Sequence, residues 1–260
     1  MSADRKRRLD QLLLDRGLAE SRAKAQALVL AGQVFSGERR LDKPGQTVPA
    51  EITLEVRTPA SPYVSRGGVK LAHALDHFGI DPTGMVALDV GASTGGFTDV
   101  LLRRGAARVY AVDVGRGQLD WRLRNNPQVV VLERTNARDL GRDLVPEPVE
   151  LVVCDASFIS LRIVLPAALR LARPGASLVA LIKPQFEVGR GEVGKGGVVR
   201  DPALHAQVCA EIARWLGETL GWQVQGTTPS PITGPKGNRE FLIAARKPVG
   251  GWPRSPATSE

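Results

Sequence analysis

The sequence predicts a two-part α/β protein, with a large domain built on a parallel sheet and a small α+β domain in front of it. Its 260 residues exceed one ordinary small domain, and 43% of them are hydrophobic, enough for a packed core. From residue 66 onward, helix-like and strand-like segments alternate, as they do in parallel α/β proteins. The first strand of that series runs into a glycine-rich turn, which is typical of nucleotide-binding sheets.

Residues 1–60 carry the pattern of the small domain. Leucines at near-helical spacing run up to Gly17, and a second helix is expected from an N-cap at Ser21 to a stop at Gly32. Short strands joined by Gly and Pro turns follow these helices. Residues 61–66, at the end of a stretch with two prolines, are expected to form a linker.

Positive charge is concentrated in the small domain. The formal net charge is +8, and residues 1–43 hold ten Lys/Arg against six Asp/Glu, a net of +4. Such a surface suits a polyanion, because lysine and arginine release counterions from phosphates, although it also suits plain solubility. Arg22 and Lys24 lie in the first turn of the second helix, where a cation opposes the helix dipole unless a phosphate or solvent neutralises it.

The stretch 21–48 is similar to the alpha-L RNA-binding module, through its Gly-x-Val turn and its "KPG" turn. That module is shared by a small-subunit ribosomal protein, pseudouridine synthases and tyrosyl-tRNA synthetases. The resemblance implies an RNA-binding role for the small domain. The residues expected to contact RNA are Arg5, Lys6, Arg22, Lys24, Arg39, Arg40 and Lys43.

The large domain alternates helices and buried strands. An amphipathic helix over 67–79 is expected to precede the sheet, because its apolar residues fall on one face. The strands are expected at 85–91, 107–115, 149–155, 176–183, 222–228 and 239–247, with a helix over 201–221 before the last two. The Pro- and Gly-rich stretch 229–238 predicts that those last two strands form a hairpin.

The stretch "LDVGASTGGFTDVLL", residues 88–102, contains the clearest functional signal. Glycines after the strand let the backbone approach a ligand, and the helix that follows offers unpaired N–H groups. Asp113 ends the next strand, where a carboxylate can accept both hydroxyls of a ribose. The alternative is a tight turn that holds no ligand. The expected cofactor-binding residues of this region are Asp89, Gly91, Ser93, Thr94, Gly95, Gly96, Phe97 and Asp113.

The glycine spacing favours S-adenosylmethionine over other adenosine cofactors. A dinucleotide site would need G-x-G-x-x-G after the strand, and a phosphate loop would need a lysine where Phe97 stands. Gly189, Gly191 and Gly194 do spell G-x-G-x-x-G, but more glycines follow them instead of a helix. That stretch is therefore expected to be a mobile loop over the site, or a loose connection.

Charged residues follow the strands where a ligand would bind. Asp155 and Lys183 end neighbouring strands of the series, and Glu240 begins the last strand, which the hairpin makes antiparallel. Lys70 lies in the first turn of the helix before the sheet. Ligands of open α/β sheets lie at the carboxyl edge of the strands, so these four could converge there. The alternative is a set of separate salt bridges.

Five segments together resemble the TlyA family of ribosomal RNA 2′-O-methyltransferases. They are "YVSRGGVKL", "DVGASTGGFTDVLL", "CDASFISL", "IKPQFEVG" and "GNREFL", in that order along nearly the whole chain. The resemblance implies a Rossmann-like class I methyltransferase domain over residues 67–248. Residues 249–260 are expected to form a disordered tail. The resemblance also implies a catalytic tetrad of Lys70, Asp155, Lys183 and Glu240, shared with FtsJ-type enzymes, and places Asn136 beside the adenine.

The tetrad suits ribose methylation. A 2′-hydroxyl must lose its proton as it attacks the methyl carbon, and a lysine can take that proton only as the neutral amine. Apolar surroundings and a second lysine would favour the neutral form of Lys183, while Asp155 and Glu240 would orient the amines and oppose that effect. The family suggests cytidines of ribosomal RNA in one or both subunits; the Pro-rich tail departs from the longer members, so activity on both subunits stays open.

Three other functions compete with ribose methylation. The family name haemolysin suggests a membrane-active protein, but no apolar stretch approaches the ~18 residues of a membrane span. A non-catalytic RNA-binding protein is the second, and an NAD oxidoreductase, which the glycine spacing disfavours, is the third.

The cysteines and the start of the chain bear on metals and location. Cys154 and Cys209 are the only cysteines and have no metal-ligand spacing, so no metal is expected. The start "MSADRKRRLD" has no apolar segment behind its charges. We therefore expect a cytoplasmic location, with a monomer favoured.

Overall fold

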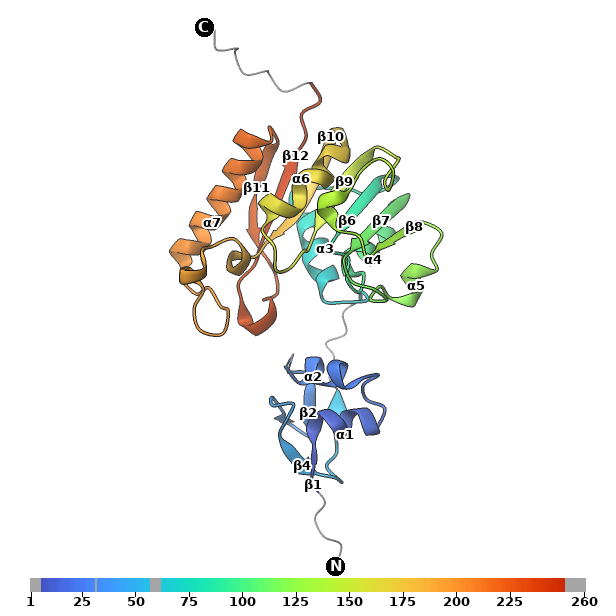
Figure 1. Ribbon diagram of the computed structural model, residues 1–260, viewed down its shortest axis with the longest axis vertical. Helices are drawn as coiled ribbons and strands as arrows, with labels where there is room; N and C mark the ends of the chain where they lie inside the picture. The colour runs from blue at the N-terminus through green and yellow to red at the C-terminus, as the bar shows by residue number, and fades with distance from the viewer. Residues whose placement is uncertain (1–5, 31, 57–61, 251–260) are drawn as a thin grey trace, which may run out of the picture. The chain divides into compact units, whose positions relative to one another are not determined.

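A computed structural model describes residues 6–30, 32–56 and 62–250. The chain divides into two compact units, Met1–Ala60 and Ser61–Glu260. Figure 1 shows the second unit as one sheet with helices on both faces, and the first as a small domain of short elements. The predicted fold class, a Rossmann-like α/β domain behind a small α+β domain, is confirmed.

The first unit packs two short helices on two small antiparallel sheets. Its elements are β1 (Lys6–Arg8), α1 (Leu9–Asp15), α2 (Arg22–Leu30), β2 (Val34–Ser36), β3 (Arg39–Arg40), β4 (Thr47–Pro49) and β5 (Glu55–Val56). β1 pairs with β4, and β2 lies between β3 and β5. The apolar faces of both helices meet in a core that includes Leu9, Leu13 and Val29. Both predicted helices are confirmed, whereas β1 was not predicted.

The second unit contains a seven-stranded sheet in the order β11-β12-β10-β9-β6-β7-β8. Its strands are β6 (Val86–Val90), β7 (Arg108–Asp113), β8 (Val129–Glu133), β9 (Val149–Cys154), β10 (Ala172–Ile182), β11 (Gln223–Pro229) and β12 (Phe241–Arg246). Its helices and helical turns are α3 (Gly67–Phe78), α4 (Gly96–Arg103), α5 (Trp121–Arg124), η1 (Ala137–Asp139), α6 (Leu161–Leu171), η2 (Pro184–Phe186), η3 (Arg190–Glu192), α7 (Pro202–Arg214), η4 (Trp215–Thr219) and η5 (Pro235–Gly237).

Strand direction creates a crevice in the middle of this sheet. The central strands β10, β9, β6, β7 and β8 are parallel, and β12 is antiparallel to both of its neighbours, which confirms the predicted hairpin. From β6 the chain winds outward to β7 and β8, and it then returns to β9 on the other side of β6. Ligands of open α/β sheets bind where the strand order reverses in this way, so the carboxyl ends of β6 and β9 mark the expected site.

Alternate residues of the strands face two separate layers of helices. Leu88, Val152 and Ala180 belong to the core under α6 and α7, while Ala87, Leu151 and Val179 belong to the core under α3 and α4. Both faces are apolar because both are covered, which explains the continuous apolar runs of these strands. The helix α6 and the strand β8 were not predicted. Of the expected disordered tail, residues 251–260 lie outside the described residues.

Candidate active site

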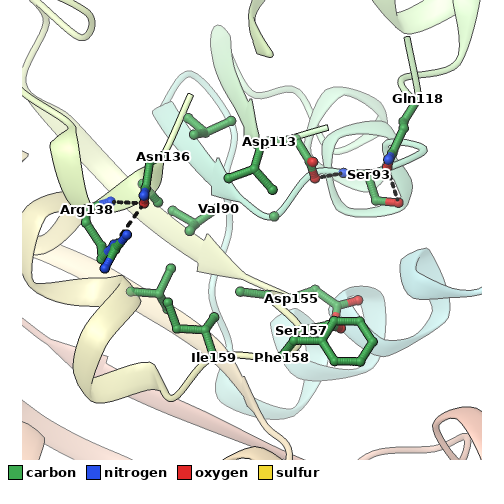
Figure 2. Close-up of a pocket in the computed structure, with 16 residues that line it drawn as sticks. Val90, Ser93, Asp113, Gln118, Asn136, Arg138, Asp155, Ser157, Phe158 and Ile159 are labelled. Atoms are coloured by element: carbon green, nitrogen blue, oxygen red, sulfur yellow. Dashed lines mark hydrogen bonds between the residues drawn. The ribbon is translucent and has the colours of Figure 1, made fainter. Parts of the chain in front are cut away.

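A pocket of about 500 Å³ opens at the carboxyl ends of β6, β7 and β9 (Figure 2). Five of the predicted site residues line it, together with residues from the loops after β8 and β9. These five are Gly91, Ser93, Asp113, Asn136 and Asp155. The volume lies in the range of small-molecule and cofactor sites, and the place is the reversal point of the sheet.

Gly91 allows the ends of β6 and β9 to approach each other. Its φ is +82°, and a Cβ on it would lie 2.9 Å from the Cα of Ala156. Asp155 N also donates to Val90 O at 3.1 Å, which joins the two strand ends just before they separate. A glycine is therefore required here by the backbone conformation and by the contact, and both serve to shape the floor of the pocket.

Asp113 holds the glycine-rich loop against the loop after β7. Its Oδ2 accepts from Ser93 N at 2.8 Å and its Oδ1 accepts from Gly115 N at 2.7 Å. A carboxylate can accept about four hydrogen bonds, so capacity remains for hydroxyl groups of a ligand. Ser93 Oγ donates to Gln118 Oε1 at 3.4 Å, and Gln118, which was not predicted, also lines the pocket.

Another part of the pocket lining combines an amide with apolar side chains. Asn136 Oδ1 accepts from the backbone N and the Nε of Arg138, at 3.1 and 3.2 Å, which leaves its NH₂ group as the part able to serve a ligand. Val114 and Ile159 supply apolar surface nearby. An apolar slot with one amide donor suits a flat heteroaromatic ring.

The other five predicted cofactor residues do not line this pocket. Gly95 has a φ of +95° and no room for a Cβ, which would meet Leu119 and Leu123. Gly96 packs on Ser65 and the start of α3. Packing under the loop therefore requires glycine at both positions. The sequence predicts a different reason, namely that these glycines let the backbone approach a ligand. The five are Asp89, Thr94, Gly95, Gly96 and Phe97.

Asp89 is a fully buried carboxyl beneath the glycine-rich loop. Thr98 Oγ1 donates to its Oδ2 at 2.7 Å, and its Oδ1 has no partner among the described residues. Burial raises the pKa of Asp89 to about 7, and the charge of Asp155 adds to the effect while the Thr98 hydrogen bond opposes it. The residue supports the loop from below.

The predicted tetrad forms two lysine–carboxylate pairs, in which Asp155 is half-buried and the other three residues are buried. Lys70 Nζ lies 2.5 Å from Glu240 Oε2, and Lys183 Nζ lies 2.7 Å from Asp155 Oδ1. The second contact is off the direction of a hydrogen bond, so Asp155 Oδ1 has an ionic partner but no hydrogen-bonded one. The hydrogen bonds of Lys183 go to Ser157 Oγ at 2.8 Å and to Asp155 O at 3.2 Å.

The start of α3 brings the two pairs into one region. A Cβ on Gly67 would lie 3.5 Å from Asp155 Oδ2, and Lys70 is one helical turn further along α3. The antiparallel strand β12 begins beside the end of β10, where Ile182 pairs with Phe241, so Glu240 and Lys183 flank one rung of the sheet. All four residues therefore lie at the edge where the pocket opens, although each lysine pairs with its own carboxylate.

Comparisons with known proteins identify the chain's relatives. Residues 63–247 match the FtsJ-like methyltransferase family, and residues 7–51 match the S4 domain. The 16S/23S rRNA (cytidine-2'-O)-methyltransferase TlyA of Mycobacterium tuberculosis is 51% identical over 93% of this chain and 90% of the relative. The chain belongs to the TlyA family.

Other members of the TlyA family bear a different name. Hemolysin A of Brachyspira hyodysenteriae is 40% identical over 90% of this chain and 98% of its own. A solved structure of a Streptococcus thermophilus protein, described as a hemolysin, has 40% identity and a TM-score of 0.75, covering 98% of this chain and 94% of that one. Within the described ranges, no helix is long and apolar enough to cross a membrane.

Two side chains that sequence analysis did not single out follow β9 and line the pocket. Ser157 binds the amine of Lys183, and Phe158 is 89% exposed although it lies on the wall of the pocket. The φ of Phe158 is +66°, a strained conformation for a bulky residue. Its ring lies 5.1 Å from the ring of Phe186.

In the described part of the chain, no group of His, Cys, Asp and Glu side chains could hold a metal ion.

Glu187 fastens the two segments that carry the Lys183–Asp155 pair. It accepts from Ser160 Oγ at 2.6 Å and from Leu161 N at 2.8 Å, at the start of α6. The segment after Lys183 is thereby tied to the segment after Asp155. Burial raises the pKa of the Glu187 carboxyl, while its hydrogen bonds oppose that shift.

The candidate RNA-binding residues lie on several elements of the first unit. Lys6, Lys24, Arg39 and Lys43 are exposed, and Arg5 lies outside the described residues. Arg40 is paired with Asp42 at 3.2 Å. The position of Arg22 has an internal explanation, because its guanidinium lies 3.2 Å from the buried Asp10, whose pKa is held well below its usual range chiefly by a hydrogen bond from Arg8. The start of α2 therefore does not require a phosphate beside Arg22.

Proposed function

We propose that this protein transfers a methyl group from S-adenosylmethionine to the ribose 2′-hydroxyl of a cytidine in ribosomal RNA, acting on ribosomal subunits. The observation that carries the proposal is the pair of lysine–carboxylate contacts, one buried and one half-buried, beside a cofactor-sized pocket. Membership of the TlyA family, whose relatives are named as enzymes of this reaction, gives independent support.

The residues of the pocket fit S-adenosylmethionine. Asp113 would accept from the ribose hydroxyls of the cofactor, the NH₂ group of Asn136 would donate to the adenine, and Val114 and Ile159 would cover its ring. Gly91 and Ser93 would supply the backbone surface beneath it. When bound, S-adenosylmethionine supplies an electrophilic methyl group on a positively charged sulfur.

The tetrad would prepare the 2′-hydroxyl. Lys183, as the neutral amine, takes the proton from the attacking oxygen, and Asp155 and Ser157 fix the direction of its Nζ. Lys70 and Glu240 hold the start of α3 against the start of β12 and supply a second ammonium–carboxylate pair. Orientation of the hydroxyl by these fixed groups is expected to give most of the rate acceleration.

The first unit is proposed to bind ribosomal RNA. Support comes from its match to the S4 domain and from its exposed lysines and arginines. The site of action would then be cytoplasmic, where ribosomal subunits are assembled.

Mass mapping of ribose methylation tests the proposal. Ribosomal RNA from both subunits would be compared between cells that contain the protein and cells that lack it, and each candidate site would be reproduced with purified protein and S-adenosylmethionine. We expect a 2′-O-methylcytidine that disappears without the protein and returns with the purified enzyme. Identical maps, together with no transfer of labelled methyl groups to RNA in vitro, would refute the proposed reaction.

A further inference from the structure

Two neighbouring loops of the second unit carry exposed cations that the proposed reaction does not use. One loop runs from η3 to the start of α7 and holds Lys195 and Arg200; the other joins β11 to β12 and holds Lys236 and Arg239. In Figure 1 these are the orange loop before α7 and the orange-red turn beside it, at the lower end of β11 and β12. We call these four residues the cationic rim.

Asn238 joins the two loops of the cationic rim. Its Oδ1 accepts from Val199 N at 3.2 Å, and its Nδ2 donates to Gly197 O at 3.0 Å. Its own carbonyl accepts from Gly234 N at 2.9 Å, and the residue is only 4% exposed. A buried amide with these partners ties the loop between η3 and α7 to the turn between β11 and β12.

Other contacts hold the same geometry. His205, buried in α7, has its Nε2 2.9 Å from Val199 O, and Gly194 and Val198 form a β-bridge. Lys236 has a φ of +59°, and its Nζ lies 3.9 Å from the position of a Cβ on Gly197. The amine of Lys236 thus lies over the loop that contains Gly197, so both loops contribute positive charge to one place.

The carboxylates in these segments are engaged with other groups. Glu192 accepts from Gly189 N at 2.9 Å, and Asp201 caps α7 by accepting from Ala203 N at 2.8 Å. Glu240, next to Arg239 in the chain, pairs with Lys70 in the tetrad. In the described part of the chain, no ion pair joins these carboxylates to the rim, so the rim presents net positive charge to solvent.

We propose that the cationic rim binds backbone phosphates of the RNA strand that continues from the target ribose. This inference rests on the proposed function. Arg239 is adjacent in the chain to Glu240 of the tetrad, and the loop that holds Lys195 and Arg200 follows the segment that begins at Lys183. Phosphates bound to the cationic rim would therefore lie beside the reacting hydroxyl. Asn238 is a positioning residue, because it acts through the loops that it joins.

Binding to purified ribosomal subunits at several salt concentrations tests the rim. The full-length double variant Lys195→Gln/Lys236→Gln should bind roughly tenfold more weakly than the parent, and its salt dependence should be shallower by about 0.7–0.9 per lost phosphate contact. The matched control is Arg170→Gln/Arg246→Gln, which removes two exposed cations at the opposite edge of the sheet. That control should keep the parent's affinity and slope.

The role of Asn238 is tested by a double-mutant cycle. Asn238→Ala should weaken subunit binding to about the level of the double variant and add little to it when combined, whereas S-adenosylmethionine binding should not change. The proposed role of the cationic rim would be refuted if the double variant kept the parent's affinity for subunits and its salt dependence. It would also be refuted if the losses in binding free energy of Asn238→Ala and of the double variant were additive. If the parent itself neither bound subunits nor methylated their RNA, the proposed function would fail first, so the two failures are distinguishable.

Discussion

Lys183 has three oxygen atoms around its amine in this structure. The amine donates hydrogen bonds to the carbonyl oxygen of Asp155 and to the hydroxyl of Ser157, and it makes an ionic contact with the carboxylate of Asp155. These three oxygens fix the position of Nζ. In the proposed reaction the neutral amine takes a proton, and the Ser157 hydroxyl can turn to donate to it. The residue next to the apolar run of β10 is thus held in place before it reacts.

Substitution of Lys183 separates a base from a positive charge. Lys183→Met keeps most of the volume and removes the amine, so the turnover number should fall by a factor on the order of 10² or more. Lys183→Arg should be nearly as damaging, because a guanidinium stays protonated. Turnover of ribosomal RNA under single-turnover conditions measures the effect, with S-adenosylmethionine affinity as the control. Near-normal turnover of the arginine variant would mean that only the charge is needed.

Asp89 predicts a pH dependence of stability. Its pKa is raised from 3.8 to about 7 by burial, so the folded chain binds this proton more tightly than the unfolded chain. The stability it contributes is therefore fully present below about pH 4 and is lost as the pH rises through about 7. Asp89→Asn cannot ionise and can still accept from Thr98, so its gain in melting temperature over the parent should be larger at pH 8 than at pH 5. Equal shifts at both pH values would contradict the buried carboxyl's titration.

At the level of elements, the pocket depends on the contact between the end of β6 and the end of β9. Val90 and Asp155 are hydrogen bonded there, and Gly91 lies against Ala156. On the other side of β9, the hairpin of β11 and β12 delivers Glu240 to the same edge. Crossover connections and one antiparallel strand therefore collect residues that lie far apart in the chain.

Gly91→Ala should disturb this contact. The new Cβ would meet the Ala156 backbone and also stand at a φ of +82°, strain on the order of 1–3 kcal/mol, so S-adenosylmethionine binding should weaken roughly tenfold or more. Gly79→Ala is a matched control, because Gly79 has a φ of +64° but nothing within 4 Å of its Cβ position. Calorimetry should show lower stability for both variants, and weaker binding of S-adenosylmethionine only for Gly91→Ala. Equal affinities in both would count against the role of the β6–β9 contact.

At the level of the whole molecule, two units with separate cores suggest separate tasks. The core of the first unit consists of residues from α1, α2 and its short strands, whereas the second unit has a core on each face of its sheet. No core cluster mixes residues of the two units among the described residues. In the described part of the chain, the cores of the second unit therefore contain no residue of the first.

Removal of residues 1–60 tests this division of labour. S-adenosylmethionine affinity should stay within about twofold of the full chain, whereas methylation of ribosomal subunits should be abolished, because the proposed RNA-binding surface is lost. Calorimetry and methyl transfer to purified subunits are the two measurements. Full activity of the shortened protein on subunits would overturn the division.

The order of most elements, the glycine-rich turn and the charged residues that end the strands are all readable in the amino-acid sequence. These features are local, since apolar periodicity and Gly or Pro turns depend on neighbours in the chain. The motifs of residues 88–102 and of Asp155, Lys183 and Glu240 also carry the family likeness, which the comparisons confirm. Gly91, Ser93, Asp113 and Asn136 lie on the pocket wall, and their role in cofactor binding stays a prediction.

The contacts between these residues depend on the tertiary structure. Lys70 and Glu240 are 170 residues apart in the chain, so their pairing depends on strand order and on the direction of β12. The same packing leaves Gly95 and Asp89 outside the pocket lining, gives Arg22 an internal partner, and brings Ser157 beside Lys183. A local pattern cannot specify such contacts, because each is fixed by the packing of segments distant in sequence around a shared sheet edge.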